Sequence, residues 1–521
     1  MNGSEAIVHT LLANDVKVCF ANPGTSEMHF VSALDTATEM RCVLGLFEGV
    51  VTGAADGYYR MADKPAATLL HLGPGLGNGL ANLHNAKRAR SGIINIVGQH
   101  ALDHIANDAP LTSDIEGIAK PMSHWVRTSM SAQTAPFDTA AAVAEAAGTP
   151  GKIATLILPA DAAWGKCTGD STLRGDVRKV ARAADENIEA IARLLGSNRF
   201  EEKSVALLLG GRAMRSKAAR LAGQIAARTG CRLLSETKNA RSERGVGRVN
   251  IPQLPYPIDA ALDALKDIRL LILVGAASPV AFFAYPGKPR LLTQPGSEVH
   301  TLATPFEDIE DTLQALCDSL GASSDKVAYV SEPGQLGQLP TGKPDSKGLG
   351  LAIATLLPEN AIVVDEAITT GRQLHQSSIM AAPHDWLEIT GGSIGYGLPA
   401  AVGAAIACPD RKVIAIEGDG SAMYTVQSLW TMARENLDIT VVICANRSYQ
   451  ILSGELANMG GPAPGPNARR MLTLGDPILD WVSLAKGHGM AATKVDNLAD
   501  FCKIFARSMQ AKGPSLIEVW L

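Results

Sequence analysis

The sequence has little of three things: charge of one sign, aromatic side chains and long apolar runs. Its 521 residues carry 47 Lys and Arg against 52 Asp and Glu, which gives a net charge of -5. Nucleic-acid binding usually requires a basic excess or a basic stripe, and the sequence has neither. Aromatic residues make up only 5% of the chain, which argues against base-stacking platforms as well. We therefore expect no nucleic-acid partner.

Membrane spans and disulfides are not expected either. No stretch approaches the roughly 20 consecutive apolar residues that a transmembrane helix requires. The first residues, MNGSEAIVHTLL, contain an early acid and no basic run, unlike a signal peptide. The eight cysteines are dispersed singly without a CxxC pair, which is typical of reduced, buried thiols. We expect a cytoplasmic protein with no membrane partner.

Glycine, proline and apolar residues are abundant, and their arrangement predicts the fold class. The chain has 50 Gly, 28 Pro and 46% hydrophobic residues, which fit an α/β protein with tight turns at its strand ends. A prior of roughly 100–200 residues per domain suggests about three domains. Short apolar runs alternate with helical stretches throughout, and this alternation predicts right-handed crossovers and mostly parallel sheets.

Two polar segments divide these apolar runs into three groups. The runs predicted as strands are VKVCF, RCVLGLF, AATLLHL, GIINIVG and KIATLIL; then VALLLGG and LLILVGA; then AIVVDEA, KVIAIEGDG, ITVVICAN and PSLIEVWL. Between the groups lie the charged stretch CTGDSTLRGDVRKVARAADEN and the Pro- and Gly-rich residues 332–348. We predict an α/β protein of three doubly wound parallel-sheet domains, at residues 1–165, 183–330 and 346–521.

Chemically active side chains follow the predicted strands of the first domain. In open parallel sheets, ligands bind beyond the carboxyl ends of the strands. The residues at these ends are Thr25 within Asn-Pro-Gly-Thr-Ser, Glu48, His71 before a Gly-Pro-Gly turn, and His100. One edge of the sheet is therefore expected to carry a carboxylic acid, imidazole rings, hydroxyls and a glycine-rich turn.

The last domain has oxygen ligands at the ends of two strands. Asp419 stands between Gly418 and Gly420, and Asn446 follows the next strand. Carboxylate and amide oxygens without Cys or His favour Mg²⁺, which is usually completed by phosphate oxygens and water. The glycines and the following helix would let backbone amides approach a diphosphate. Taken alone, Gly-Asp-Gly is also compatible with a plain turn.

The spacing of these residues resembles a known family. Gly-Asp-Gly, 25 intervening residues and then Asn is similar to the diphosphate and metal signature of thiamine diphosphate enzymes. The segment Gly391–Ala401, GGSIGYGLPAA, resembles the one that precedes this signature, and Glu48–Arg60, EGVVTGAADGYYR, resembles the family's glutamate helix. The resemblance extends over essentially the whole chain. It implies the pyrimidine-binding, central and diphosphate-binding domain order of the acetolactate synthase/benzoylformate decarboxylase group.

The resemblance implies roles for individual residues. Glu48 would hydrogen-bond the aminopyrimidine ring and promote loss of the thiazolium proton, and Ile394 would support the thiazolium. The alternative for Glu48 is a carboxylate that merely stabilises a helix N-terminus, and the alternative for Ile394 is an isoleucine of the hydrophobic core. Asp419, Asn446 and the carbonyl of Ser448 would bind Mg²⁺. Further cofactor-binding candidates are Gly392, Thr369, Thr370, Gly418, Gly420, Ser421 and Tyr449.

The resemblance favours non-oxidative decarboxylation of a 2-oxo acid. His71 and Thr25 match an active-site His and Ser of benzoylformate decarboxylase, although a structural His that caps the turn is the alternative. The segment 278–285 lacks that enzyme's second His, so either His100 or His104 substitutes for it or the second proton step is handled differently. Open alternatives are an acetolactate synthase-like carboligase, a C–C lyase and a non-catalytic cofactor-binding homologue.

Two further expectations concern cofactors and assembly. The Phe-Gln pair of acetolactate synthases is replaced by Pro110-Leu111, which weakens the carboligase interpretation. No firm FAD signature is found, although GGRAMRSKAAR after VALLLGG leaves a nucleotide open, and the spacing does not fit nicotinamide binding. In this family the glutamate and the metal site meet across a subunit boundary. The resemblance therefore implies a homodimer or homotetramer.

Overall fold

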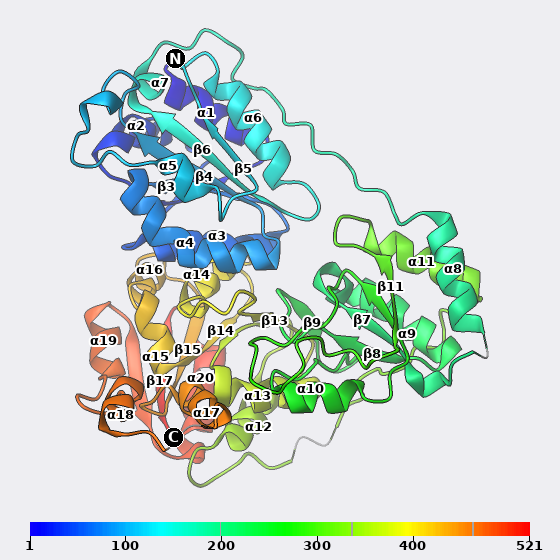
Figure 1. The fold of residues 1–521 in the computed structure, drawn as a ribbon. Helices are drawn as coiled ribbons and strands as arrows, with labels where there is room; N and C mark the ends of the chain where they lie inside the picture. Colours follow the sequence, from blue (N-terminus) through cyan, green and yellow to red (C-terminus); the bar gives the residue numbers. More distant parts are fainter. Residues whose placement is uncertain (198, 335–336, 461–462) are drawn as a thin grey trace.

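The computed structural model describes residues 1–197, 199–334, 337–460 and 463–521 (Figure 1). Its strands form three sheets of six, four and seven strands, each flanked by helices. Every pairing of named strands is parallel except that of one short strand, β9 (Ser242–Arg244), which runs antiparallel. The predicted α/β fold with three parallel-dominated sheets is confirmed.

The first sheet has the order β2-β1-β3-β4-β6-β5. Its strands are β1 (Val18–Asn22), β2 (Arg41–Leu44), β3 (Ala66–Leu70), β4 (Ile93–Gln99), β5 (Trp125–Thr128) and β6 (Ile153–Pro159). Its helices are α1 (Gly3–Ala13), α2 (Met28–Thr36), α3 (Glu48–Ala62), α4 (Leu72–Ala89), α5 (Ile115–Ala119), α6 (Ala135–Ala146) and α7 (Ala160–Trp164). All five predicted strands are present, and the edge strand β5 is an addition.

The second sheet has the order β11-β10-β7-β8. Its strands are β7 (Val205–Leu209), β8 (Arg232–Ser235), β10 (Leu270–Val274) and β11 (Glu298–Ala303), and its helices are α8 (Asp185–Gly196), α9 (Ser216–Thr229), α10 (Ile258–Leu265) and α11 (Ile309–Leu320). β7 and β10, the two strands predicted here, lie side by side at its centre.

The third sheet has the order β16-β17-β15-β14-β12-β13-β9. Its strands are β12 (Ile362–Glu366), β13 (His384–Glu388), β14 (Val413–Gly418), β15 (Ile439–Ala445), β16 (Ala491–Val495) and β17 (Ser515–Trp520), with β9 at the edge. Its helices are α12 (Ser346–Leu356), α13 (Ile368–Ser377), α14 (Gly397–Ala407), α15 (Asp419–Ala422), α16 (Ser428–Arg434), α17 (Gln450–Asn458), α18 (Pro466–Leu472), α19 (Trp481–Gly487) and α20 (Leu498–Gln510). Because β9 comes from the middle third of the chain, the second and third sheets are tied together. The boundaries given above for the three domains stay a prediction.

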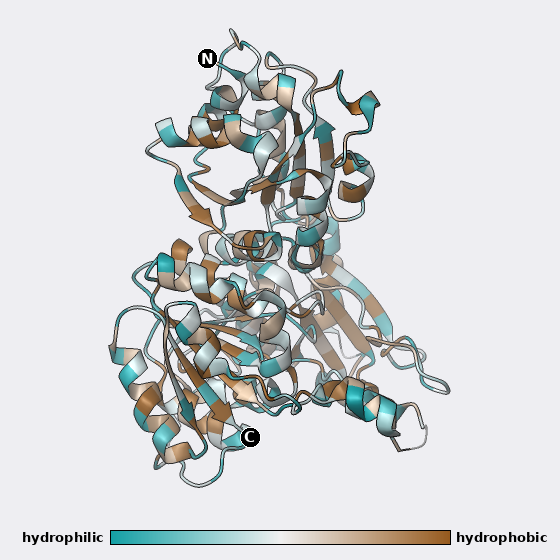
Figure 2. Cartoon of the chain, turned by 90° about the vertical axis from the view of Figure 1, so that its left-hand side faces the viewer, coloured by the Kyte–Doolittle hydropathy of each residue, from teal (hydrophilic) through white to brown (hydrophobic). Residues whose placement is uncertain are grey.

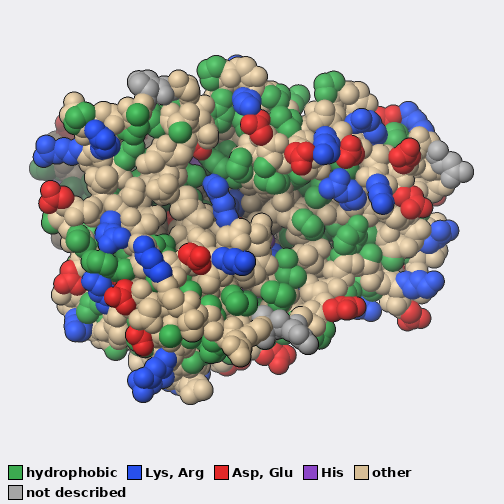
Figure 3. All heavy atoms as spheres, turned by 90° about the horizontal axis from the view of Figure 1, so that it is seen from below, with side chains coloured by type: hydrophobic (Ala, Val, Ile, Leu, Met, Phe, Trp, Pro, Cys, Tyr) green, Lys and Arg blue, Asp and Glu red, His purple; other side chains and the backbone are tan. Residues whose placement is uncertain are grey.

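The central strands are buried on both faces, as parallel strands between helices must be. All seven residues of β4 and all seven of β15 are buried. Brown apolar segments accordingly follow the strands in Figure 2. On the face seen in Figure 3, positive and negative side chains are interspersed. No helix among the described residues is long and apolar enough to cross a membrane. All eight cysteines are free, and Cys42 departs from expectation because it is exposed.

Helix α3 of the first sheet packs directly on α14 of the third (Figure 1). Glycines allow this approach, because a methyl group at Gly57 would come within 2.1 Å of the carbonyl oxygen of Ala400. One at Gly403 would come within 1.9 Å of the carbonyl oxygen of Ala54. Gly57, within the segment Glu48–Arg60, and Gly403, just beyond the segment Gly391–Ala401, therefore allow the two helices to pack closely.

A buried arginine fixes the same contact. Arg60 on α3 forms a buried ion pair with Asp56, with 2.7 Å between Nη2 and Oδ2. Its Nη1 also donates to the carbonyl oxygen of Glu388 and to the hydroxyl of Tyr396. Because the guanidinium is partnered on several sides, its burial is compensated. This network holds the start of α14 against the first domain.

Candidate active site

Glu48 is the first residue of α3 and is only 7% exposed. Its backbone position at a helix N-terminus favours a negative charge. Asn78 Nδ2 on α4 donates to Oε2 at 2.9 Å. The other oxygen, Oε1, has no hydrogen-bond partner among the described residues, and Gly75 lies beside it. Glu48 is therefore a buried, oriented carboxylate with one oxygen available to a ligand.

A carboxylate–imidazole pair lies at the neighbouring strand ends. His71, at the N-cap of α4, has its Nδ1 2.7 Å from Oε2 of Glu27. Glu27 is buried, and its Oε2 also accepts the backbone amide of Gly24. Its Oε1 is buried without a hydrogen-bond partner among the described residues, and a side chain at Gly98 would collide with it. Donation from Nδ1 to Glu27 leaves Nε2 of His71 as the basic nitrogen.

Glu27 was not among the residues singled out from the sequence. The only sequence signal for it is a glutamate three positions after Gly24 at the start of a helical turn, a spacing typical of caps. Its contact with His71 spans 44 residues and depends on the pairing of β1 with β3. The sequence pattern gives no information about that contact.

Glu27→Gln is expected to lower kcat by about 100-fold, since a glutamine cannot hold the Nδ1 proton as a carboxylate does. KM should change much less. Steady-state kinetics measures both. Ser26→Ala provides the comparison, because the Ser26 hydroxyl lies 3.4 Å from the same Nδ1 and should contribute less. A kcat within twofold of the parent would contradict the importance of the pair.

Two other candidates of the first domain, Thr25 and His100, make no hydrogen bond to His71 among the described residues. Thr25 begins a 3₁₀ turn and is exposed, whereas the adjacent Ser26 is the residue whose hydroxyl approaches His71. His100 follows β4 with Nε2 buried and unpartnered among the described residues, and its ring packs edge-on against His104. No hydrogen bond joins His100 to His71 in the described part of the chain. Their assigned roles stay predictions.

Asp419 and Asn446 follow the adjacent strands β14 and β15. The predicted closeness of their loops is found, because the Arg447 amide donates to Oδ2 of Asp419 at 2.7 Å. Gly420 N donates to Oδ1 of the same carboxylate, and Asn446 Oδ1 accepts from Ser448 N. Burial raises the pKa of Asp419, although the backbone amides oppose that shift. A cation would offset the cost of burying this charge.

The donor set here consists of one carboxylate, one amide oxygen and the carbonyl of Ser448. No group of three or more His, Cys, Asp and Glu suited to a metal is found in the described ranges. A hard cation that keeps phosphate and water ligands needs few protein ligands. Tyr449 lies over Gly420, where a side chain would come within 2.6 Å of its ring. Glycine is thus required at that position.

The loop that carries Ile394 is shaped by a buried acid. Glu366, the last residue of β12, accepts the amides of Gly395, Tyr396 and Gly397 at 2.8, 3.2 and 2.7 Å. Gly392 and Gly395 have positive φ values of 75° and 96°, which glycine adopts without strain. Thr369 and Thr370 lie at the start of α13, after the same strand, with Thr370 buried.

A second buried acid stands beside Glu366. Glu417 is its register partner on β14, and neither of its oxygens has a hydrogen-bond partner among the described residues. Burial raises the pKa of Glu366 to about 7 and that of Glu417 well above its ordinary value. We infer that the two carboxyl groups hold a proton between them at neutral pH. Because both pKa values are raised in the folded state, the contribution of this pair to the stability of the protein is greatest at low pH. It declines as the pH rises through the folded-state pKa values.

Glu417→Gln is expected to reduce that decline, because a glutamine amide donates to Glu366 without a proton to lose. The fall in Tm between about pH 5 and about pH 8 should be smaller in the variant than in the parent. Thermal unfolding at the two pH values measures it. Glu359→Gln, at an exposed glutamate, should behave as the parent. A variant less stable than the parent at the higher pH would overturn the shared-proton interpretation.

The middle domain contacts this region through aromatic residues. Phe282 is 49% exposed and its ring edge lies 3.1 Å from the point where Gly392 would carry a Cβ. Residues 451–458 belong to helix α17. The hydroxyls of Tyr256 and Tyr285 both donate to Glu455 on this helix. Phe282 thus lies beside Gly392, in the loop that also carries Ile394, and α17 is tied to the middle domain.

The fold and these motifs define a thiamine diphosphate-dependent enzyme. The N-terminal TPP binding domain of thiamine pyrophosphate enzymes matches residues 1–119, and the C-terminal TPP binding domain matches residues 369–519. This chain belongs to that family of decarboxylases and carboligases.

Relatives of full length support the assignment. The chain is 48% identical over 521 residues to "Putative acetolactate synthase large subunit IlvX" of Mycobacterium tuberculosis, covering 100% of this chain and 99% of the relative. It is 30% identical to benzoylformate decarboxylase of Pseudomonas aeruginosa, covering 96% and 95%. The structure of Rhodococcus jostii 4-hydroxybenzoylformate decarboxylase superposes with a TM-score of 0.84 at 25% identity, covering 99% and 98%.

The residues present fit both thiamine diphosphate and a divalent cation. Glu48 is a buried residue with one carboxylate oxygen that has no hydrogen-bond partner among the described residues, as a ring-nitrogen donor requires. Asp419 and Asn446 supply hard oxygen atoms on adjoining loops beside glycine. When bound, thiamine diphosphate supplies a carbon nucleophile and then accepts the electron pair left by loss of carbon dioxide. The protein residues orient it and handle protons.

Proposed function

We propose that the chain catalyses the thiamine diphosphate- and Mg²⁺-dependent, non-oxidative decarboxylation of a 2-oxo acid, in the manner of benzoylformate decarboxylase. The observation that carries this proposal is the Glu27–His71 pair, whose Nε2 is an acid–base group at the same strand ends as Glu48. A decarboxylase must return a proton to the product carbon, and an oriented histidine suits that step.

Each part of the chain has its own task in this proposal. Glu48 hydrogen-bonds the aminopyrimidine and promotes loss of the thiazolium proton, and Ile394 supports the thiazolium. Asp419, Asn446 and the Ser448 carbonyl hold Mg²⁺ against the diphosphate. His71 moves the proton of the product, and Thr25 or Ser26 hydrogen-bonds the substrate carboxylate.

A second candidate is carboligation to an acetolactate-type product. It is favoured by the name of the 48% identical relative from Mycobacterium tuberculosis. The two reactions share the steps up to loss of carbon dioxide and differ in what then accepts the carbon fragment. The absence of a Phe-Gln pair at Pro110-Leu111 makes it the less favoured of the two.

Product analysis separates these candidates. The purified chain would be incubated with thiamine diphosphate, Mg²⁺ and a panel of aliphatic and aromatic 2-oxo acids, with products identified by mass spectrometry. Aldehyde alone is the expected result, and a condensed hydroxyketone would support the second candidate against the first. Carbon dioxide from none of the acids would support a non-catalytic homologue.

We further infer that the protein is cytoplasmic and self-associates as a dimer or tetramer. The eight free cysteines support a reducing compartment. The family resemblance supports self-association. Within one chain, Asn82 Nδ2 donates to the carbonyl oxygens of Gly49 and Gly395 and so joins the first and third sheets. Light scattering of the purified protein tests the assembly, with a monomeric mass as the contrary result.

A further inference from the structure

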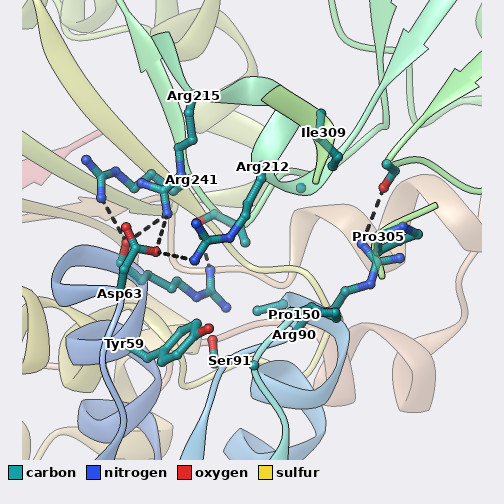
Figure 4. Close-up of a pocket in the computed structure, with 16 residues that line it drawn as sticks. Tyr59, Asp63, Arg90, Ser91, Pro150, Arg212, Arg215, Arg241, Pro305 and Ile309 are labelled. Atoms are coloured by element: carbon teal, nitrogen blue, oxygen red, sulfur yellow. Dashed lines mark hydrogen bonds and ion pairs between the residues drawn. The ribbon is translucent and has the colours of Figure 1, made fainter. Parts of the chain in front are cut away.

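The middle domain is held against both other domains by ion pairs. Arg212 and Arg215 reach from it to Asp63 at the end of α3, with N–O distances of 3.3 and 3.2 Å (Figure 4). Arg241 pairs with Asp385 on β13, the strand with which β9 is paired. The middle domain is therefore a fixed support, and a segment tied to it has a defined position relative to the candidate active site.

Helix α17 is a segment with little buried surface of its own. It begins at Gln450, shortly after the loop that carries Asn446 and Ser448. None of its nine residues, all of which the structure describes, is buried. A helix of this length is not stable by itself in water. Contacts at its surface, where α13 and α18 lie beside it, must therefore determine its position (Figure 1).

A single carboxylate ties α17 to the middle domain. The hydroxyl of Tyr256 donates to Oε1 of Glu455 at 3.2 Å, and the hydroxyl of Tyr285 donates to Oε2. Burial and the neighbouring carboxylate raise the pKa of Tyr256, and the hydrogen bond to Glu455 raises that of Tyr285, so both hydroxyls keep their protons. Hydrogen bonds to a carboxylate are stronger than those between neutral groups. Glu455 thus makes two strong hydrogen bonds to two segments of the middle domain.

Tyr256 also connects this tie to the loop that carries Ile394. Its ring centroid lies 5.3 Å from that of Phe282, and Phe282 lies beside Gly392. The guanidinium of Arg372 on α13 lies over the ring of Tyr256, 5.6 Å from its centroid. Both kinds of contact restrain an aromatic ring. Tyr256 is therefore a fixed point between α17 and the loop of Ile394.

Two exposed apolar side chains adjoin this connection. Phe282 is 49% exposed, and Leu452 is 47% exposed. Leu452 precedes Glu455 by three residues on α17, so the two side chains share one face of the helix. Exposed apolar surface beside a candidate active site is suited to contact with the carbon skeleton of a substrate. The distance between Phe282 and Leu452 depends on the hydrogen bonds of Glu455.

We propose that Glu455 is a positioning residue for the substrate. Through Tyr256 and Tyr285 it holds α17 at the distance from Phe282 at which a 2-oxo acid fits between them. Without these hydrogen bonds α17 would move away from the middle domain, and the substrate would lose apolar contact on one side. Substrate binding would therefore suffer more than the chemical step. This role rests on the proposed function, whereas the tie itself does not depend on any reaction.

Hydrogen–deuterium exchange of the full chain, saturated with thiamine diphosphate and Mg²⁺, tests the tie. Amides of residues 450–458 should exchange about tenfold faster or more in Glu455→Ala, since a lost hydrogen bond to a charged group costs at least that factor. Tyr285→Phe should give an intermediate rate. In Glu455→Gln the side-chain amide can accept from one tyrosine and donate to the other, so protection should be largely retained.

The control for exchange is on the same helix. Asn458→Ala changes an exposed residue of α17 and should exchange like the parent. Equal exchange of these amides in the parent and in Glu455→Ala would show that Glu455 does not hold the helix, and would overturn the proposal.

Steady-state kinetics on a 2-oxo acid that the parent decarboxylates tests the positioning role. Glu455→Ala should raise KM about tenfold or more while kcat falls by no more than about threefold, and Glu455→Gln should restore KM to within about threefold of the parent. A parental KM in Glu455→Ala, together with faster exchange of α17, would show a merely structural tie and overturn the role. A parent that decarboxylates none of the acids would contradict the proposed function and this role with it, while exchange would still decide on the tie.

Discussion

Glu48→Gln is expected to abolish the accelerated exchange of the thiazolium proton and to lower kcat by about 10²–10⁴-fold. A glutamine at this position keeps the volume and the contact with Asn78, but it cannot stabilise a protonated or imino pyrimidine ring. Affinity for thiamine diphosphate in the presence of Mg²⁺ should stay within about threefold, because the diphosphate and metal contacts are in another domain. Acid-quenched deuterium exchange followed by NMR measures the first effect, and calorimetry the second.

A matched control is available in the same domain. Glu39→Gln changes an exposed glutamate after α2 and should leave exchange, kcat and cofactor affinity as in the parent. If Glu48→Gln retained parental exchange, Glu48 would be only a helix-start carboxylate. Loss of cofactor binding together with exchange would instead point to a structural role for this buried residue.

Asp419→Asn is expected to weaken Mg²⁺-dependent binding of thiamine diphosphate by at least about 30-fold, equivalent to about 2 kcal/mol. The variant replaces the buried carboxylate with a neutral side chain whose single amide oxygen can accept only one of the two backbone N–H groups that the parent carboxylate accepts. Because burial raises its pKa, the ionised Asp419 costs free energy in the absence of a cation. Without cofactor the lost charge and the lost contact act in opposite directions, so the Tm of the Asn variant should lie close to that of the parent, and with cofactor and Mg²⁺ it should lie below it.

The pH dependence follows from the same shift. Protons compete with Mg²⁺ for Asp419, so the parent should lose metal affinity as the pH falls, beginning above the ordinary aspartate pKa of about 3.9. Asp419→Asn should lack this loss. Asp410→Asn, at an exposed turn, is the control and should resemble the parent. Parental Mg²⁺ affinity in Asp419→Asn would place the metal elsewhere.

The sequence predicted the parts of the fold that are buried on both sides. Strands such as β4 and β15 are continuous apolar runs, which only a sheet covered by helices explains. The strands that were not predicted are mostly edge strands with no continuous apolar pattern, namely β5, β8, β9, β11 and β16. The exception is β13, whose sequence HDWLE is largely polar although all of its residues are buried. β9 is held in place by its pairing with β13 of the third sheet. The sequence around residues 242–244 contains no pattern that predicts this pairing.

In the candidate site, too, some residues could be predicted from strand topology and others could not. Asp419 and Asn446 were predictable because adjacent strands place their ends together, a consequence of topology alone. The contact of Glu27 with His71 and that of Glu366 with three amides depend on how loops pack, and acids after strands look alike in a sequence. Burial, which distinguishes them, arises from tertiary structure.

The most direct test of the central claim is the rate of deuterium exchange at the thiazolium carbon of thiamine diphosphate bound to the parent chain with Mg²⁺. If the chain is a catalyst whose buried Glu48 serves the aminopyrimidine, exchange on the protein is orders of magnitude faster than in the free cofactor. Exchange no faster than that of free thiamine diphosphate, on protein shown to be saturated with cofactor, would contradict the account.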